Sequence, residues 1–115
     1  MVDDDPMIIR LMERILDDAG YRTVSASDGQ AGLQCVRDQH PALVVLDVMM
    51  PKLDGLEVTR ALRAEAETSA VPIILLSARA LPADVAIGLD AGANDYVVKP
   101  FDITDLLERI ARLLS

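Results

Sequence analysis

Short apolar segments alternate along this chain with longer segments whose apolar residues recur every three or four positions. The first pattern is typical of buried strands and the second of helices that cover a sheet. The predicted strands are Met1–Val2, Tyr21–Ala26, the start of Ala42–Pro51, Ile73–Leu76 and Asp95–Lys99, and the predicted helices are Pro6–Ala19, Gln30–Gln39, Leu56–Glu67, Pro82–Asp90 and Ile103–Leu114. This alternation with short connections predicts an α/β fold, a doubly wound (βα)5 parallel sheet of five strands with helices on both faces.

The stretch Ala42–Pro51 begins with the third predicted strand. Five apolar residues in a row end on the carboxylate of Asp47, and Pro51 stops further regular structure. Open α/β sheets bind their ligands outside the carboxyl ends of the strands. Asp47 therefore belongs to a binding site or, if it acts alone, to a turn or a helix cap.

Size and charge restrict what the chain binds. Its 115 residues suit a single domain, residues 1–115, and 51% hydrophobic residues are enough for a core. A net charge of −8 and an aromatic content of 3% argue against direct binding of nucleic acid. The single cysteine, Cys35, excludes an internal disulfide and suits a cytoplasmic location, and no apolar run is long enough for a membrane span.

Polar groups end four of the predicted strands. Asp3 and Asp4 end the first, Asp47 the third, Ser77 the fourth and Lys99 the fifth. The carboxyl ends of parallel strands lie at one edge of a sheet, so these side chains are predicted to meet. Taken singly, the acidic pair also fits solvated charge, Ser77 a structural hydroxyl and Lys99 a surface charge. Their shared position favours a site.

The combination of these groups predicts a reaction. Three carboxylates in one place require a cation, and oxygen ligands suit Mg²⁺, which commonly bridges carboxylate to phosphate. Lys99 would keep Asp47 ionised and neutralise an incoming anion, and Ser77 would donate to a phosphoryl oxygen. The set predicts phosphoryl transfer to the Asp47 carboxylate. A glycine-rich phosphate loop is absent, because Gly88 and Gly92 are interpreted as helix-end and turn glycines.

Four motifs follow one another along the chain, namely Val2-Asp3-Asp4-Asp5-Pro6, Leu46-Asp47-Val48-Met49-Met50-Pro51 with Asp54-Gly55, Leu76-Ser77-Ala78, and the run from Gly92 to Phe101. In these motifs and their order the chain resembles the receiver domain of two-component response regulators, similar in outline to the chemotaxis regulator. The resemblance covers the chain from end to end. It implies a flavodoxin-like sheet with strand order 2-1-3-4-5. In that order Tyr21–Ala26 is an edge strand, as its alternation of polar and apolar residues also indicates.

The resemblance also implies roles for single residues. Asp47 resembles the phosphoacceptor, and Lys99 resembles the family's lysine, with an expected cis peptide bond to Pro100. Asp3 and Asp4 resemble the acidic pair that holds Mg²⁺ together with Asp47, and the backbone carbonyl of Met49 resembles a further ligand.

A switch is implied as well. Ser77 resembles the switch hydroxyl, and Tyr96 the switch aromatic whose ring turns inward when Ser77 moves toward the phosphoryl group. Phosphorylation would then change the face formed by residues 82–114, which an output domain or a downstream protein recognises.

The resemblance names partners by class. A histidine kinase, a phosphotransfer protein or a small phosphodonor would deliver the phosphate, and the domain would catalyse only its own phosphorylation and dephosphorylation. Asp95 and Arg109 match the charged dimer face of the DNA-binding subfamily, whereas Asn94 and Ile87 replace charges expected there. We therefore expect a phosphorylation-dependent homodimer, but one that lacks part of the salt bridges of that subfamily. Met49 and Arg79 match a pattern of that subfamily that suggests slow dephosphorylation.

The chain departs from the family in its shortened first strand. Two residues precede the acidic pair, where the family has four or five apolar residues. Since the first strand is central in this sheet, we expect a lower stability than that of a chain with about four more apolar residues there.

The sequence is also compatible with two other functions. A pseudo-receiver would bind partners without phosphorylation. An aspartyl-phosphate phosphatase of the haloacid-dehalogenase type would use the same nucleophile and metal, but it needs a second aspartate at position 49, where this chain has methionine.

Overall fold

The computed structural model describes residues 1–2, 5–21, 26, 28–49 and 54–114. In chain order the elements are α1 (Pro6–Asp18), α2 (Gly29–Gln39), β1 (Val44–Asp47), α3 (Gly55–Ala64), β2 (Ile73–Ser77), α4 (Pro82–Ala91), β3 (Asp95–Val98) and α5 (Ile103–Leu114). The strands β1, β2 and β3 are the third, fourth and fifth strands of the prediction. Most of the predicted edge strand Tyr21–Ala26 lies outside the described residues.

The sheet is parallel and has the predicted order where it is described. β1 pairs with β2 so that Asp47 lies opposite Leu76, and β2 pairs with β3 so that Ser77 lies opposite Val98. Val2 forms parallel bridges to both Ala26 and Leu46. It therefore stands where the order 2-1-3-4-5 requires the first strand, between the second strand and β1.

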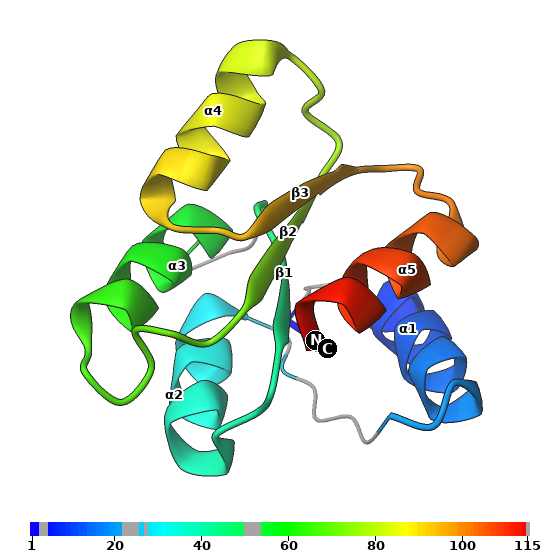
Figure 1. Ribbon diagram of the computed structural model, residues 1–115, viewed down its shortest axis with the longest axis horizontal. Coiled ribbons are helices and arrows are strands. Elements are labelled where there is room, and N and C mark those ends of the chain that lie inside the picture. The colour runs from blue at the N-terminus through cyan, green and yellow to red at the C-terminus, as the bar shows by residue number, and fades with distance from the viewer. Residues whose placement is uncertain (3–4, 22–25, 27, 50–53, 115) are drawn as a thin grey trace.

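Helices cover both faces of the sheet (Figure 1). α1 and α5 pack on one face, where Met12, Leu16, Leu106 and Ile110 meet Val45, Ile74, Leu76 and Val97. α2, α3 and α4 lie on the other face, where Leu33, Val36, Val58 and Leu62 meet Val44, Leu46, Ile73 and Leu75. Successive strand residues alternate between the two clusters, as side chains of a pleated strand must. The predicted α/β fold is confirmed.

Aspartate side chains begin four of the helices, and at α5 Asp102 accepts the N–H of Asp105. Asp5, Asp28 and Asp54 cap α1, α2 and α3 by accepting the N–H groups of Met7, Ala31 and Glu57. Each cap satisfies a donor that the first turn of a helix leaves without an internal partner.

α3 ends earlier than predicted. It stops at Ala64 rather than Glu67, because Glu65 has an extended backbone and the hydroxyl of Thr68 donates to the carbonyl of Leu62 at 2.7 Å. The interpretation of Gly88 as a helix-end glycine is wrong as well. Gly88 lies inside α4, which continues to Ala91 and ends at Gly92.

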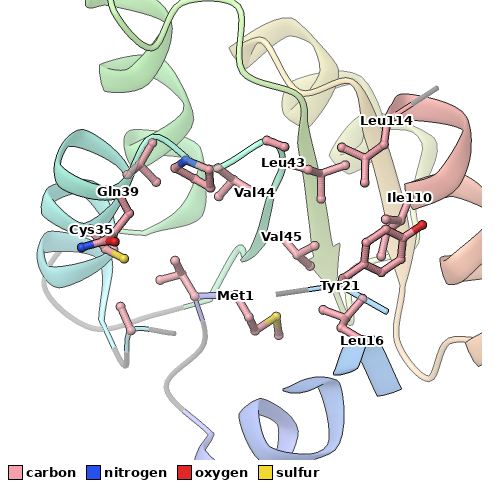
Figure 2. Close-up of a pocket in the computed structure, with 16 residues that line it drawn as sticks. Met1, Leu16, Tyr21, Cys35, Gln39, Leu43, Val44, Val45, Ile110 and Leu114 are labelled. Carbon is pink, nitrogen blue, oxygen red and sulfur yellow. The ribbon is translucent and has the colours of Figure 1, made fainter. Parts of the chain in front are cut away.

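A cavity of about 680 Å³ opens beside Met1 (Figure 2). Both Val44 and Val45 line it, although they point to opposite faces of the sheet. Residues of α2, such as Cys35, and of α5, such as Leu114, complete the wall. The cavity therefore passes from one face to the other beside β1, in line with Val2, where the shortened first strand was predicted.

Within the described ranges, every helix is too short or too polar to cross a lipid bilayer.

Candidate functional site

The carboxylate of Asp47 is buried at the carboxyl edge of the sheet, with 5% of the residue exposed. Its Oδ1 accepts the backbone N–H of Met49 at 3.3 Å, and its Oδ2 lies 3.4 Å from Nζ of Lys99. A buried carboxylate is costly unless charges or hydrogen-bond donors compensate it. The ammonium and the amide provide that compensation at the end of an apolar strand.

Lys99 follows β3 directly and reaches Asp47 from the side of the sheet that carries β2 and β3. Its backbone N–H donates to the carbonyl of Ser77 at 2.8 Å, and its peptide bond to Pro100 is cis, as the resemblance implied. The sheet thus fixes the backbone of Lys99. The side chain is 24% exposed and extends from that fixed point to the carboxylate.

Ser77 ends β2 between the two charged residues in the strand order. It is fully buried, and its Oγ accepts the backbone N–H of Arg79 at 3.0 Å. The residue before it, Leu76, pairs with Asp47, and the residue opposite it, Val98, precedes Lys99. Asp47, Ser77 and Lys99 therefore share one edge of the sheet, where the sequence predicted that they meet.

Tyr96, on β3, binds the loop that follows β2 and contains Arg79. Tyr96 is 8% exposed, and its hydroxyl donates to the carbonyl of Arg79 at 2.9 Å. Arg79 is thus held at its N–H by Ser77 and at its carbonyl by Tyr96. Arg79 therefore joins Ser77 to Tyr96 through one backbone segment.

The predicted acidic pair, Asp3 and Asp4, lies outside the described residues. Val2, the residue before them, donates its N–H to the carbonyl of Val45 at 2.8 Å and accepts the N–H of Asp47 at 2.9 Å. The backbone that enters the acidic pair is therefore bonded to the backbone of Asp47.

Asp47 is the described carboxylate of the predicted metal site. Within the described ranges, no group of three or more His, Cys, Asp or Glu side chains could hold an ion. Asp47 itself supplies the hard oxygen donors that Mg²⁺ prefers, and Met49, whose carbonyl was predicted as a ligand, is two residues further on. The donor chemistry at Asp47 fits Mg²⁺, and the other predicted carboxylates fall in the segment not described.

Gly55 is a residue of this region whose role the sequence did not reveal. A Cβ at Gly55 would lie 2.5 Å from the carbonyl oxygen of Asp47 and 3.0 Å from Cα of Val48. The N–H of Gly55 also donates to the carbonyl of Val48 at 3.0 Å. Only glycine allows α3 to begin this close to the end of β1. Asp54 is the cap and Gly55 the first residue of α3, which thus begins one residue before the predicted start at Leu56.

The predicted dimer-face charges pair within the chain. Arg109 lies 2.6 Å from Asp95 and 3.0 Å from Asp105. Asn94 accepts hydrogen bonds from Arg63 and from the N–H of Ile73, and Ile87 is 47% exposed. The face thus combines an internal ion-pair network with an exposed apolar residue.

Comparison with known proteins shows the family. Residues 1–111 match the model of the response regulator receiver domain, and the chain belongs to that family. It is 49% identical to a probable transcriptional regulator ycf27 of Cyanophora paradoxa and 43% identical to the DNA-binding response regulator MtrA of Mycolicibacterium smegmatis. These matches cover 99% and 98% of the chain but only 46% and 49% of the relatives, so the chain spans about half their length.

Solved structures agree with the fold. A response regulator of Chloroflexus aurantiacus superimposes with a TM-score of 0.93 at 34% identity, over 98% of this chain and 93% of that one. The receiver domain of a sensor histidine kinase from Pseudomonas aeruginosa gives a TM-score of 0.90 at 35% identity, over 98% and 93% of the two chains. That protein is described with a magnesium ion coordinated in its active-site cleft. This chain is therefore a receiver domain, the phosphoacceptor signalling module of two-component systems.

Proposed function

We propose that residues 1–115 form a receiver domain in which Asp47 accepts the phosphoryl group. The observation that carries this assignment is the 3.4 Å approach of the Lys99 ammonium to the buried Asp47 carboxylate. A buried carboxylate at the carboxyl edge of the sheet, with an ammonium beside it, is a nucleophile held in place beside a cation. Catalysis of phosphoryl transfer consists largely of such positioning and charge stabilisation.

The proposed reaction uses three side chains. An oxygen of Asp47 forms the new bond to phosphorus while the bond from phosphorus to the donor nitrogen or oxygen breaks, and the leaving group departs with that electron pair. Lys99 stabilises the negative charge on the phosphoryl oxygens, and the hydroxyl of Ser77 donates to one of them. Ser77 would exchange its hydrogen bond from Arg79 for this new contact.

Mg²⁺ would be held by Asp47, by Asp3 and Asp4, and by the backbone carbonyl of Met49. When bound, the ion supplies positive charge that brings the carboxylates and the phosphoryl oxygens together. Support for this set comes from the donor chemistry of Asp47 and from the pairing of Val2 with the backbone of Asp47. We also propose that the domain catalyses only its own phosphorylation and dephosphorylation.

The effect of phosphorylation would reach the face of residues 82–114 through the backbone of Arg79. Ser77 and Tyr96 both bind its backbone, and α4 begins three residues later, at Pro82. We infer that phosphorylation favours one arrangement of the face of residues 82–114, and that a partner reads this arrangement. Candidate partners are a histidine kinase or phosphotransfer protein as donor, and an output domain, a downstream protein or a second copy as receiver of the signal, all in the cytoplasm.

Labelling by a small phosphodonor tests the proposal. With Mg²⁺ and acetyl phosphate, the intact chain should gain one phosphoryl group by mass spectrometry, and Asp47→Ala should gain none. Asp90→Asn is a matched control, because it removes an exposed carboxylate of α4 and should be labelled normally. Labelling that persisted in Asp47→Ala would refute the assignment. Failure of the folded wild-type chain to bind beryllofluoride with Mg²⁺ would favour a pseudo-receiver instead.

A further inference from the structure

Gly88 is an unfavourable choice for its position in α4. It lies in the interior of this ten-residue helix and is buried, whereas glycine is the poorest helix former except proline. The described glycines with positive φ are Gly20 and Gly92, so the backbone conformation of Gly88 does not require glycine. A reason for glycine must therefore lie in the space around it.

The ring of Tyr96 occupies that space. A Cβ at Gly88 would lie 2.8 Å from Cδ2 and 3.1 Å from Cε2 of Tyr96, and 3.1 Å from Cδ1 of Leu75. Carbon atoms in favourable contact lie about 3.5–4.0 Å apart. Any other residue at position 88 would therefore require a neighbour to move.

The neighbours differ in their freedom to move. Leu75 belongs to the central strand β2 and is fully buried, so it cannot withdraw. Tyr96 lies on β3, at the end of the described sheet, and its ring can leave by rotation about its own side-chain bonds. When the ring leaves, its hydroxyl loses the 2.9 Å hydrogen bond to the carbonyl of Arg79.

We infer that Gly88 is a positioning residue for the switch, because it provides the notch in α4 that admits the inward ring of Tyr96. With the ring in the notch, the hydroxyl holds the loop after β2, in which Arg79 also donates to Ser77. Filling the notch displaces the ring and releases the carbonyl of Arg79, so Tyr96 no longer holds the loop whose N–H group binds the hydroxyl of Ser77. This inference rests on the proposed function only for its consequence at the phosphorylation site, since the notch itself is a matter of packing.

The first measurement is the position of the ring. The chain has two tyrosines, so tyrosine labelled with ¹³C in the ring gives separate signals for Tyr21 and Tyr96. In the wild type we expect the Tyr96 ring signals to show a buried environment, with or without beryllofluoride and Mg²⁺. In Gly88→Ala they should move to the values of an exposed ring while those of Tyr21 stay unchanged. A Tyr96 ring that remained buried in Gly88→Ala, for instance because α4 shifted instead, would overturn the inference.

The second measurement is the affinity for beryllofluoride in the presence of Mg²⁺. Coupling between two sites typically changes affinity by about 5-fold or more, and we expect a loss of that size in Gly88→Ala. In a Tyr96→Ala background the same substitution should change the affinity less than about 2-fold, because no ring is left to displace. An equal loss in both backgrounds would contradict a role through Tyr96.

Ala86→Gly is the matched control. It weakens the same helix at an exposed position and leaves the notch open, so the ring and the affinity should stay as in the wild type. If the wild type itself neither binds beryllofluoride nor is labelled at Asp47, the proposed function fails. The ring measurement on Gly88→Ala without ligand still tests whether Gly88 is needed to admit the ring of Tyr96.

Discussion

The ammonium nitrogen of Lys99 lies 3.4 Å from Oδ2 of Asp47. Two different strands deliver these residues, and a third strand separates them, so their approach depends on the register of the whole sheet. β2 pairs with β1 up to Asp47 and with β3 up to Val98, so Asp47 is level with Val97 and Lys99 lies two residues further along at the carboxyl edge. The distance therefore links the packing of the core to the chemistry of the site.

Removal of this ammonium should slow phosphorylation. In Lys99→Ala the charge that develops on the phosphoryl oxygens would lose a fixed cation, and loss of one such contact typically costs about 100-fold or more in rate. The initial rate of labelling by acetyl phosphate with Mg²⁺ measures this effect. Arg60→Ala removes an exposed cation of α3 and should leave the rate unchanged. A Lys99→Ala variant labelled as fast as the wild type would exclude Lys99 from the reaction.

Arg63 should be one of the most sensitive positions for stability. Its guanidinium donates to the carbonyl of Gly92 at 2.9 Å, to the carbonyl of Val71 at 2.6 Å and to Oδ1 of Asn94 at 2.9 Å. It thus joins α3 to the end of α4 and to the start of β3. The guanidinium is partly withdrawn from water, and this burial lowers the pKa of Arg63.

We expect Arg63→Ala to lower the free energy of unfolding by about 2 kcal/mol or more. The substitution removes several hydrogen bonds from a charged donor, and the carbonyls that accepted them lose that donor. Urea denaturation measures the change. Arg60→Ala, three residues earlier and exposed, should change stability by less than about 0.5 kcal/mol. Equal effects of the two substitutions would mean that the Arg63 contacts contribute little.

These residues show what the sequence could and could not predict. The meeting of Asp47, Ser77 and Lys99 followed from one rule, that parallel strands place their carboxyl ends together. The bounds of α5 were predicted correctly because Asp102, whose side chain accepts the N–H of Asp105, marks its start. Signals of this kind are local or repeat with the period of the element.

The roles of Arg63, Gly55 and Gly88 depend on contacts that no local pattern encodes. The partners of Arg63 include backbone carbonyls, which look alike in every sequence. Gly55 and Gly88 are needed because another element approaches them, Asp47 in one case and the ring of Tyr96 in the other. Glycines of this type resemble turn or helix-end glycines until the packing is known.

The ion pair between Arg37 and Glu65 should give a small stability term that depends on pH. It joins α2 to the residue that follows α3. The hydrogen bond that the two side chains share lowers the pKa of Glu65 below its usual value. A carboxylate whose pKa is lowered by folding contributes stability above its unfolded pKa, and this contribution is lost as the pH falls through the folded value.

Arg37→Ala should therefore lower the Tm slightly at neutral pH, and the difference from the wild type should shrink in acid. Thermal unfolding from about pH 7 to about pH 3 measures both effects. Arg10→Ala is the control, because it changes the net charge equally at an exposed position of α1. A gap between wild type and Arg37→Ala that grew in acid would contradict the assigned cause.

Filling the cavity beside Met1 should stabilise the fold. The cavity of about 680 Å³ lies in line with Val2, whose hydrogen bonds to Val45 and Asp47 are the start of a strand ladder, and Leu43 and Val45 line the positions where that ladder would continue. Burial also lowers the pKa of the Met1 amino group, because the surroundings disfavour its charged form. We expect an extension of about four apolar residues before Met1 to pair with β1 and to occupy the cavity.

An extension of the same length made of glycine and serine is the matched control, because it moves the amino group equally but supplies no apolar side chains. Each buried aliphatic side chain contributes about 1.5–3 kcal/mol, and about 1 kcal/mol raises the Tm of a domain of this size by roughly 4–8 °C. The apolar extension should therefore melt several degrees above the polar one, and the amide of Val45 should exchange more slowly with deuterium. Equal melting temperatures for the two extensions would show that this space does not accept a strand.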